Sequence, residues 1–452
     1  MNTIKKIAAR ALLTGAIGLF VINSALAGIP IEHWTQISGV QVFLVPSPAI
    51  PMVDVQIDFD AGSRRDPASQ AGLASVTARM ADKGVLASGT EPALDENALS
   101  EAWADLGASF GAGASPDRMS FALRSLTYPD LLGKATQLAA RQLGEPAFPE
   151  TIWQRERETL NAAIKEANTR PATLAARAFN AGVYGPHPYG FEMTQETLAR
   201  ISVADMKAVY SALIQPCRAK VTVVGAVNRA QADALVTQLF SHLLAKTTAA
   251  CPALPAVADV TPLDKPAEQH IAFVSAQAHV LIGQPGFKRD DPDYFPLIVG
   301  NYILGGGGFV SRLTEEVREK RGLSYSVYSY FSPGLHNGAF TVGLQTRPDQ
   351  ADKAVQVSRE VVANFVTHGP TKTELKAAKD NLIGGFALRI DSNRKLLDNV
   401  ANIAWNNLPL DYLDTWTQQV EKVTAADIKA AFARKLQPGK MVTVVLGAES
   451  AK

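Results

Sequence analysis

The stretch "ISVADMKAVYSALIQPCRAKVTVVGAV", residues 201–227, recurs in altered form near the end of the chain as "VTAADIKAAFARKLQPGKMVTVVLGAE", residues 423–449. Asp205 and Asp427 lie 222 residues apart, and so do the Gln-Pro pairs that follow them. Each copy predicts a helix that begins at a Ser or Thr N-cap with Asp three residues later, then a proline break and a β-branched strand. A repeat of this length indicates a duplicated domain rather than a short-period solenoid.

The 452-residue chain is long enough for two such domains. A segment rich in Pro, Ala and Thr separates them and predicts a linker at 246–266, between domains at 30–245 and 267–452. Each domain opens with strand patterns, and long helical patterns follow without strict alternation. We therefore expect an α+β fold: two homologous domains, each a largely antiparallel sheet with helices packed on one side.

The first 27 residues combine a basic start, an apolar run and a small-residue cleavage signal. This pattern predicts a signal peptide, residues 1–27, and a periplasmic protein with no membrane span after cleavage. A membrane anchor is the alternative, although the apolar run is short and interrupted by Asn23. In an oxidising compartment Cys217 and Cys251 could form a disulfide, or they could remain two small unpaired hydrophobic residues. The net charge of +1 argues against a nucleic-acid partner.

Sequence motifs for catalysis are scarce. None of the seven histidines has the spacing of an H-E-x-x-H or H-x-x-E-H zinc helix, and no G-x-S-x-G nucleophile motif is present. The run "LGGGGF", residues 304–309, lacks the Lys-Ser/Thr of a phosphate-binding loop. We expect it to form a tight turn that brings backbone close to a substrate. The candidate substrate-binding residues are Gly305, Gly306, Gly307 and Gly308.

One short stretch, "REKRGLSYSVYSY" at residues 318–330, contains a candidate binding pair. A helix is predicted to end at Gly322, and a strand follows. Arg318 precedes this turn and Tyr325 follows it, so both side chains can converge on one carbonyl or anion. The alternative is an arginine that only satisfies the helix dipole and a tyrosine that only packs in a sheet.

The longer segment "HVLIGQPGFKRDDPDYFPLIVGNYILGGGGFVSRLTEEVREKRGLSYSVYSY", residues 279–330, strongly resembles the C-terminal domain of the pitrilysin/insulinase (inverzincin) family of zinc peptidases. The resemblance is to the short-chain branch that includes mitochondrial processing peptidase. The segments "HPYG", "VTVVGAV" and "GLASVTARMADKG" of the first domain fit the same family. The resemblance covers residues 30–449.

The resemblance implies that the family's H-x-x-E-H motif falls on "GLASVTARMADKG". There Ser75 and Arg79 occupy the histidine positions, and Ala78 occupies the position of the catalytic glutamate. The third zinc ligand, a glutamate on a later helix, is placed at Ala163, with Glu166 one turn away. A fixed cation at Arg79 opposes a divalent metal, so we expect this chain to bind no cofactor.

The resemblance also implies that Arg318 and Tyr325 bind the substrate carbonyl at a zinc site in another domain. The expected function is therefore the non-catalytic subunit of a heterodimeric periplasmic zinc metallopeptidase, which completes the active site of a zinc-bearing partner acting on a peptide. A peptide-binding or assembly module that only retains the fold is the main alternative. A self-sufficient peptidase with unrecognised ligands is a third possibility.

Overall fold

In the computed structural model, residues 28–245 and 251–447 can be described. The predicted signal peptide, residues 1–27, lies outside the described residues. Within them, helices and strands form two sheets with their own helices, which confirms the predicted α+β fold. None of the helices in this part of the chain is long and apolar enough to cross a membrane.

The two sheets repeat one topology. Sheet 1 has the order β1-β2-β6-β3-β5-β4, and sheet 2 has the order β7-β11-β8-β10-β9. All neighbours are antiparallel except β2 with β6 and β7 with β11, which hold equivalent places. The strands of sheet 1 are β1 Glu32–Thr35, β2 Gln41–Pro46, β3 Met52–Phe59, β4 Ser109–Ala114, β5 Met119–Leu126 and β6 Lys220–Gly225. Those of sheet 2 are β7 Ala267–Ala272, β8 Ala278–Pro285, β9 Val327–Phe331, β10 Ala339–Thr346 and β11 Val442–Gly447.

The helices repeat as well. Both predicted N-cap patterns form capping boxes, in which Ser202 pairs with Asp205 and Thr424 with Asp427. The helices of the first domain are α1 Leu73–Ala81, α2 Glu96–Asp105, α3 Pro129–Gly144, α4 Glu150–Ala167, α5 Pro171–Tyr184, α6 Gln195–Ala199, α7 Val203–Leu213, α8 Arg229–Leu239 and α9 Ser241–Leu244. Those of the second are α10 Tyr294–Asn301, α11 Ala351–His368, α12 Lys372–Gly384, α13 Asn393–Trp405, α14 Tyr412–Lys422 and α15 Ala425–Lys435.

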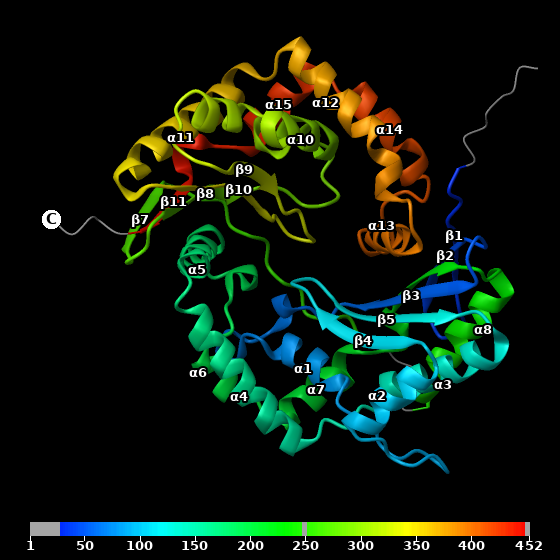
Figure 1. Cartoon of the computed structure of the whole chain (residues 1–452). Coiled ribbons are helices and arrows are strands. Elements are labelled where there is room, and N and C mark those ends of the chain that lie inside the picture. The colour runs from blue at the N-terminus through cyan, green and yellow to red at the C-terminus, as the bar shows by residue number, and fades with distance from the viewer. Residues whose placement is uncertain (1–27, 246–250, 448–452) are drawn as a thin grey trace, which may run out of the picture.

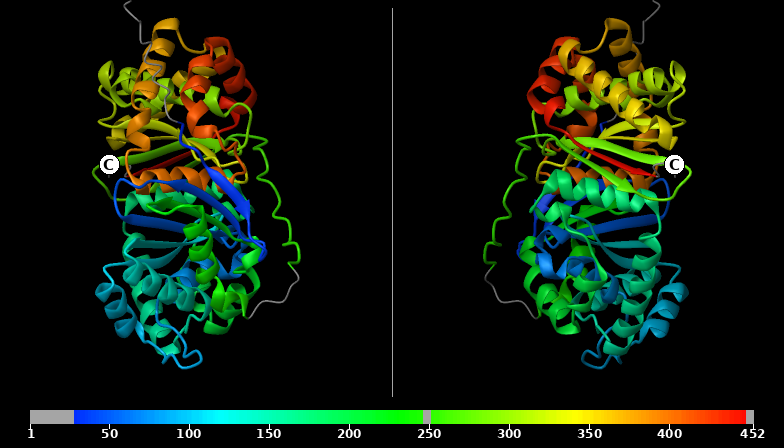
Figure 2. Two further views of the ribbon diagram at one scale, coloured as in Figure 1. Left: turned by 90° about the vertical axis from the view of Figure 1, so that its right-hand side faces the viewer. Right: turned by 90° about the vertical axis from the view of Figure 1, so that its left-hand side faces the viewer.

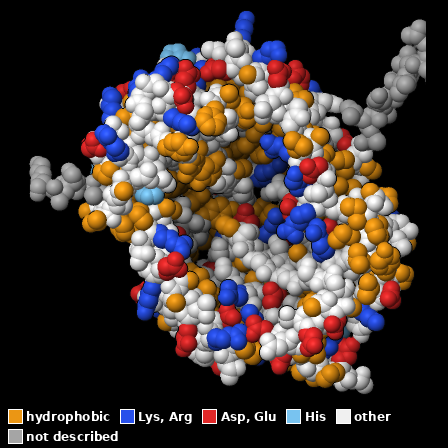
Figure 3. All heavy atoms as spheres, viewed as in Figure 1, with side chains coloured by type: hydrophobic (Ala, Val, Ile, Leu, Met, Phe, Trp, Pro, Cys, Tyr) orange, Lys and Arg blue, Asp and Glu red, His pale blue; other side chains and the backbone are white. Residues whose placement is uncertain are grey.

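One helix of each domain covers the sheet of the other. Helix α5 packs on β8 and β11, where Phe179 joins a buried cluster with Val444. Helix α13 packs on β6 and β3, where Val400 joins a cluster with Val224. The two sheets consequently face each other across a space with α5 at one end and α13 at the other (Figure 1). The space-filling view shows this space as a central hollow (Figure 3).

The described part of the linker, residues 251–266, runs along the outside of the molecule towards the second domain (Figure 2). Cys217 and Cys251 form a disulfide with an S–S distance of 1.97 Å, so the alternative of two unpaired cysteines does not apply. This bond attaches the start of the linker to the turn after α7. It closes a loop with a sequence separation of 34 residues.

Candidate functional site

Helix α1 carries the positions that the family resemblance assigns to the zinc motif. Ser75 and Arg79 lie one turn apart and are exposed, whereas Ala78 is buried in the core of the first domain. The helix therefore presents the two former histidine positions on one accessible face. Neither a short hydroxyl nor a guanidinium is a zinc ligand of the kind that structural and catalytic sites use.

A carboxylate from α4 faces these positions. Glu156, which is only 5% exposed, accepts a hydrogen bond on Oε2 from Nε of Arg79. Its other oxygen lies 3.4 Å from Nζ of Lys83. Burial alone would raise the pKa of Glu156, but the hydrogen bond from Arg79 and the charge of Lys83 outweigh it and lower the pKa. The guanidinium of Arg79 thus neutralises the buried carboxylate of Glu156.

The position predicted for the third ligand lies further along the same helix. The resemblance put it at Ala163, which is exposed and lies two turns beyond Glu156 on α4. Glu166, the neighbouring candidate, pairs with Arg170 near the end of the helix. One carboxylate paired with a fixed cation does not fit a zinc ion. In the described part of the chain, no group of three or more His, Cys, Asp or Glu residues could hold a metal.

Arg318 and Tyr325 converge, as the turn between them predicted. The guanidinium carbon of Arg318 lies 4.8 Å from the ring centroid of Tyr325 and 4.7 Å from that of Phe309, a residue that the sequence analysis overlooked. Gly322 adopts φ 60° at the turn, and Arg318 belongs to a π-helical segment, Thr314–Glu319, rather than to a regular α-helix. Tyr325 is 82% exposed, so its hydroxyl is accessible to a ligand.

Close packing accounts for most of the glycine run. A Cβ on Gly305 would lie 2.4 Å from Oγ of Ser329 on β9, and one on Gly307 would lie 2.7 Å from the carbonyl oxygen of Tyr302. Gly308 differs, because it adopts φ 60° with no atom within 4 Å of its added Cβ. Gly305 therefore lets this turn approach β9, Gly306 and Gly307 pack against residues 301–302, and Gly308 borders open space.

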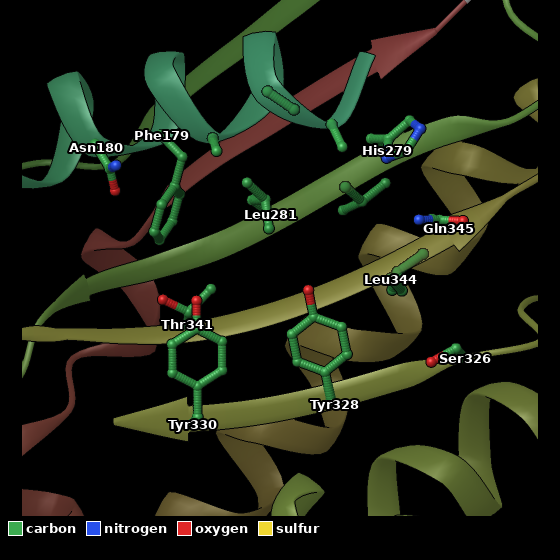
Figure 4. Close-up of a pocket in the computed structure, with 14 residues that line it drawn as sticks. Phe179, Asn180, His279, Leu281, Ser326, Tyr328, Tyr330, Thr341, Leu344 and Gln345 are labelled. Carbon is green, nitrogen blue, oxygen red and sulfur yellow. The ribbon is translucent and has the colours of Figure 1, made fainter. Parts of the chain in front are cut away.

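A cavity of about 290 Å³ lies in the hollow between α5 and sheet 2. The rings of Tyr328 and Tyr330 stand side by side on β9, with centroids 5.9 Å apart, and face Phe179 and Asn180 of α5 (Figure 4). Apart from His279, no residue that lines it can carry a charge at neutral pH. This cavity suits an uncharged group that stacks on an aromatic ring.

Comparison with known proteins gives a consistent result. The family described as Insulinase (Peptidase family M16) matches residues 41–195, and the one described as Peptidase M16 inactive domain matches residues 200–382. The "Uncharacterized zinc protease YmxG" of Bacillus subtilis is 26% identical over 82% of this chain and 88% of its own length. The "Non-peptidase homolog YmxG" of Helicobacter pylori is 26% identical over 84% of this chain and 85% of its own.

A solved structure shares most of the fold. The peptidase M16 inactive domain from Pseudomonas fluorescens superimposes with a TM-score of 0.86 at 33% sequence identity. The match covers 93% of this chain and 98% of that one.

Proposed function

Because this chain belongs to the M16 (insulinase) peptidase family, we propose that it is the non-catalytic subunit of a heterodimeric zinc metallopeptidase and supplies Arg318 and Tyr325 to a zinc-bearing partner. The comparisons support a non-catalytic M16-like protein. In agreement, the resemblance assigns Ser75, Ala78 and Arg79 to the metal-binding and catalytic positions of the motif. One observation carries the proposal: Arg318 and Tyr325 form an accessible pair, although this chain has no zinc ligands of its own at the positions assigned to the motif.

The geometry of the pair suits a carbonyl that becomes an oxyanion. The rings of Phe309 and Tyr325 contact the guanidinium of Arg318 while its N–H donors lie in the guanidinium plane, at its edge. Glu319 occupies part of that edge, with an oxygen 3.2 Å from Nε. The remaining N–H groups and the hydroxyl of Tyr325 can donate to one oxygen. Such donors stabilise the transition state of peptide hydrolysis more than the substrate.

The proposed location is the periplasm. The predicted signal peptide supports export, and the Cys217–Cys251 disulfide is of a kind that persists in oxidising compartments. A second candidate function, a peptide-binding module without a catalytic role, is favoured by the uncharged cavity beside Tyr328 and Tyr330. The two functions differ in whether Tyr325 affects turnover by a partner.

The test is reconstitution with a zinc-bearing M16 chain from the same genome, with complex formation checked by size-exclusion chromatography. Tyr325→Phe removes one hydroxyl and keeps the ring, so the mixed dimer should form. Its kcat on a peptide should fall on the order of 10²–10³-fold, as when one oxyanion donor is removed. Tyr128→Phe, at another exposed tyrosine in the first domain, is the matched control. Full turnover by a normally assembled Tyr325→Phe dimer would refute the proposal and favour the binding module.

A further inference from the structure

A second cavity lies against the inner face of sheet 1. It has a volume of about 610 Å³, and we call it the arginine trough; its lining is Gln56, residues 109–115, Arg118, Ser120, Ala122 and Arg394. Strand β4 contributes only Ser, Gly and Ala side chains apart from Phe110, whose ring is buried against Trp103 and Phe121. The floor of the trough is therefore mostly backbone, with room for an extended chain.

The acidic groups on this face lie beneath arginines. Asp54 on β3 has a side chain only 3% exposed, and both its oxygens accept hydrogen bonds from Arg124, which is 46% exposed. Asp58 is buried in the same way beneath Arg118, with Nη1 3.0 Å from Oδ2. Arg124 shares its face of β5 with two lining residues, because alternate residues of a strand point the same way. In both pairs the guanidinium is more exposed than its carboxylate, so the solvent-facing charged groups on this part of sheet 1 are arginines.

The opposite wall adds another cation. Arg394 projects from the first turn of α13 with a side chain 60% exposed, and its Nε lies 3.5 Å from a carboxylate oxygen of Asp398, whose side chain is 54% exposed. Lys220 is not counted among the cations available to a ligand, because its Nζ donates hydrogen bonds to the carbonyl of Ala404 and the amide oxygen of Asn407 at the end of α13. Lys and Arg side chains gather along this wall of the hollow, between α13 and sheet 1 (Figure 3).

We propose that the arginine trough binds extended peptide segments that carry carboxylates. This inference rests on the proposed function, since it names the class of peptide that the mixed peptidase receives. Arginine binds carboxylate through a planar fork of two N–H donors, and the small residues of β4 let a backbone approach. Segments rich in Lys or Arg are disfavoured by the same charges.

The first experiment measures peptide affinity for the isolated chain by fluorescence anisotropy. The probes are labelled peptides of equal length: glutamate-containing with an amidated end, glutamine-containing with an amidated end, glutamine-containing with a free carboxylate, and lysine-containing with an amidated end. We expect the glutamate peptide to bind about tenfold more tightly than its amidated glutamine counterpart, and the lysine peptide to bind most weakly. The difference should shrink as salt rises from about 0.05 M to about 0.5 M.

The third peptide separates two sources of the carboxylate. If it matches the glutamate peptide, the trough recognises a C-terminus; if it matches the amidated glutamine peptide, the trough recognises acidic side chains. Equal affinity for all four peptides would overturn the proposal.

Variants locate the site. Arg394→Gln leaves no buried acid unpaired, and it should reduce the preference for glutamate about threefold or more. Lys376→Gln makes the same charge change at a well-exposed residue of α12 and should leave the preference unchanged. Equal behaviour of the two variants would also overturn the proposal. Because no partner is present, this result is independent of turnover by the Tyr325→Phe dimer, so the two proposals can fail separately.

Discussion

Replacing Arg79 by alanine tests whether its ion pair with Glu156, which joins α1 to α4, stabilises the fold. The variant leaves a carboxylate buried with Lys83 and Arg155, each 3.4 Å from it, as its remaining cations. Removing one partner of a fully buried pair costs about 3–5 kcal/mol, whereas an exposed pair contributes about 0–1 kcal/mol. Glu156 is buried but the side chain of Arg79 is 46% exposed, so we expect a loss of about 1–2 kcal/mol. That corresponds to a decrease in Tm of roughly 3–6 °C for a domain of this size.

The effect should depend on pH with a defined sign. The pKa of Glu156 is lowered in the folded protein from its ordinary value of 4.5, so the folded state binds fewer protons there than the unfolded state. The stabilisation is therefore present above pH 4.5 and is lost as the pH falls through the lowered pKa. Differential scanning calorimetry at pH 7, 5 and about 3.5 should show the gap between wild type and Arg79→Ala narrowing only at the lowest pH.

Two further variants make the reasoning refutable. Arg79→Ala combined with Glu156→Gln removes the buried charge together with its partner, and it should be more stable than Arg79→Ala alone. Arg170→Ala breaks the exposed pair with Glu166 at the end of α4 and should change stability by less than about 0.5 kcal/mol. If the double variant is no more stable than Arg79→Ala, the ion pair does not cause the loss of stability. The same conclusion would follow if the stability difference between wild type and Arg79→Ala were equal at every pH.

Two more outcomes are expected. Ser75→His combined with Arg79→His places two imidazoles on one face of α1 opposite Glu156, so elemental analysis of this variant should detect bound zinc. Adding Glu156→Gln should weaken zinc binding. Equal zinc content in the two variants would contradict the assignment of Glu156 as a ligand. Gly305→Ala should destabilise the protein by more than about 1 kcal/mol, the usual cost of overpacking a core, because its Cβ would clash with β9. Gly308→Ala should add only backbone strain and cost less. Thermal melts that show Gly308→Ala to be the less stable variant would exclude the packing explanation.

Local patterns in the sequence predicted much of this structure. The capping boxes at Ser202 and Thr424 are formed by residues three apart, so short-range chemistry was enough to find them. The meeting of Arg318 with Tyr325 follows from a single glycine turn between them. In both cases the interacting residues are close in sequence.

Other features depend on contacts between distant segments. Glu156 lies 77 residues from Arg79, and nothing in the sequence of α4 specifies which of its faces meets α1. Likewise, the apolar face of α5 predicts burial but not the sheet that buries it. The glycine run suggested a ligand, whereas close packing explains three of its four members: Gly305 lies against β9, and Gly306 and Gly307 lie against Asn301 and Tyr302. Contacts of this kind can be identified only once the tertiary structure is known.

The exchange of α5 and α13 has a consequence for how the chain could have changed during evolution. Each half of the duplication has an apolar cluster on its sheet that packs against a helix of the other half. A gene truncated to one half would produce a protein with a large exposed apolar surface, which favours aggregation. Selection for solubility alone would therefore retain both halves, whatever the activity of the first. Exposed positions such as Arg79 on α1 are then free to change, provided that the interlocked core is preserved.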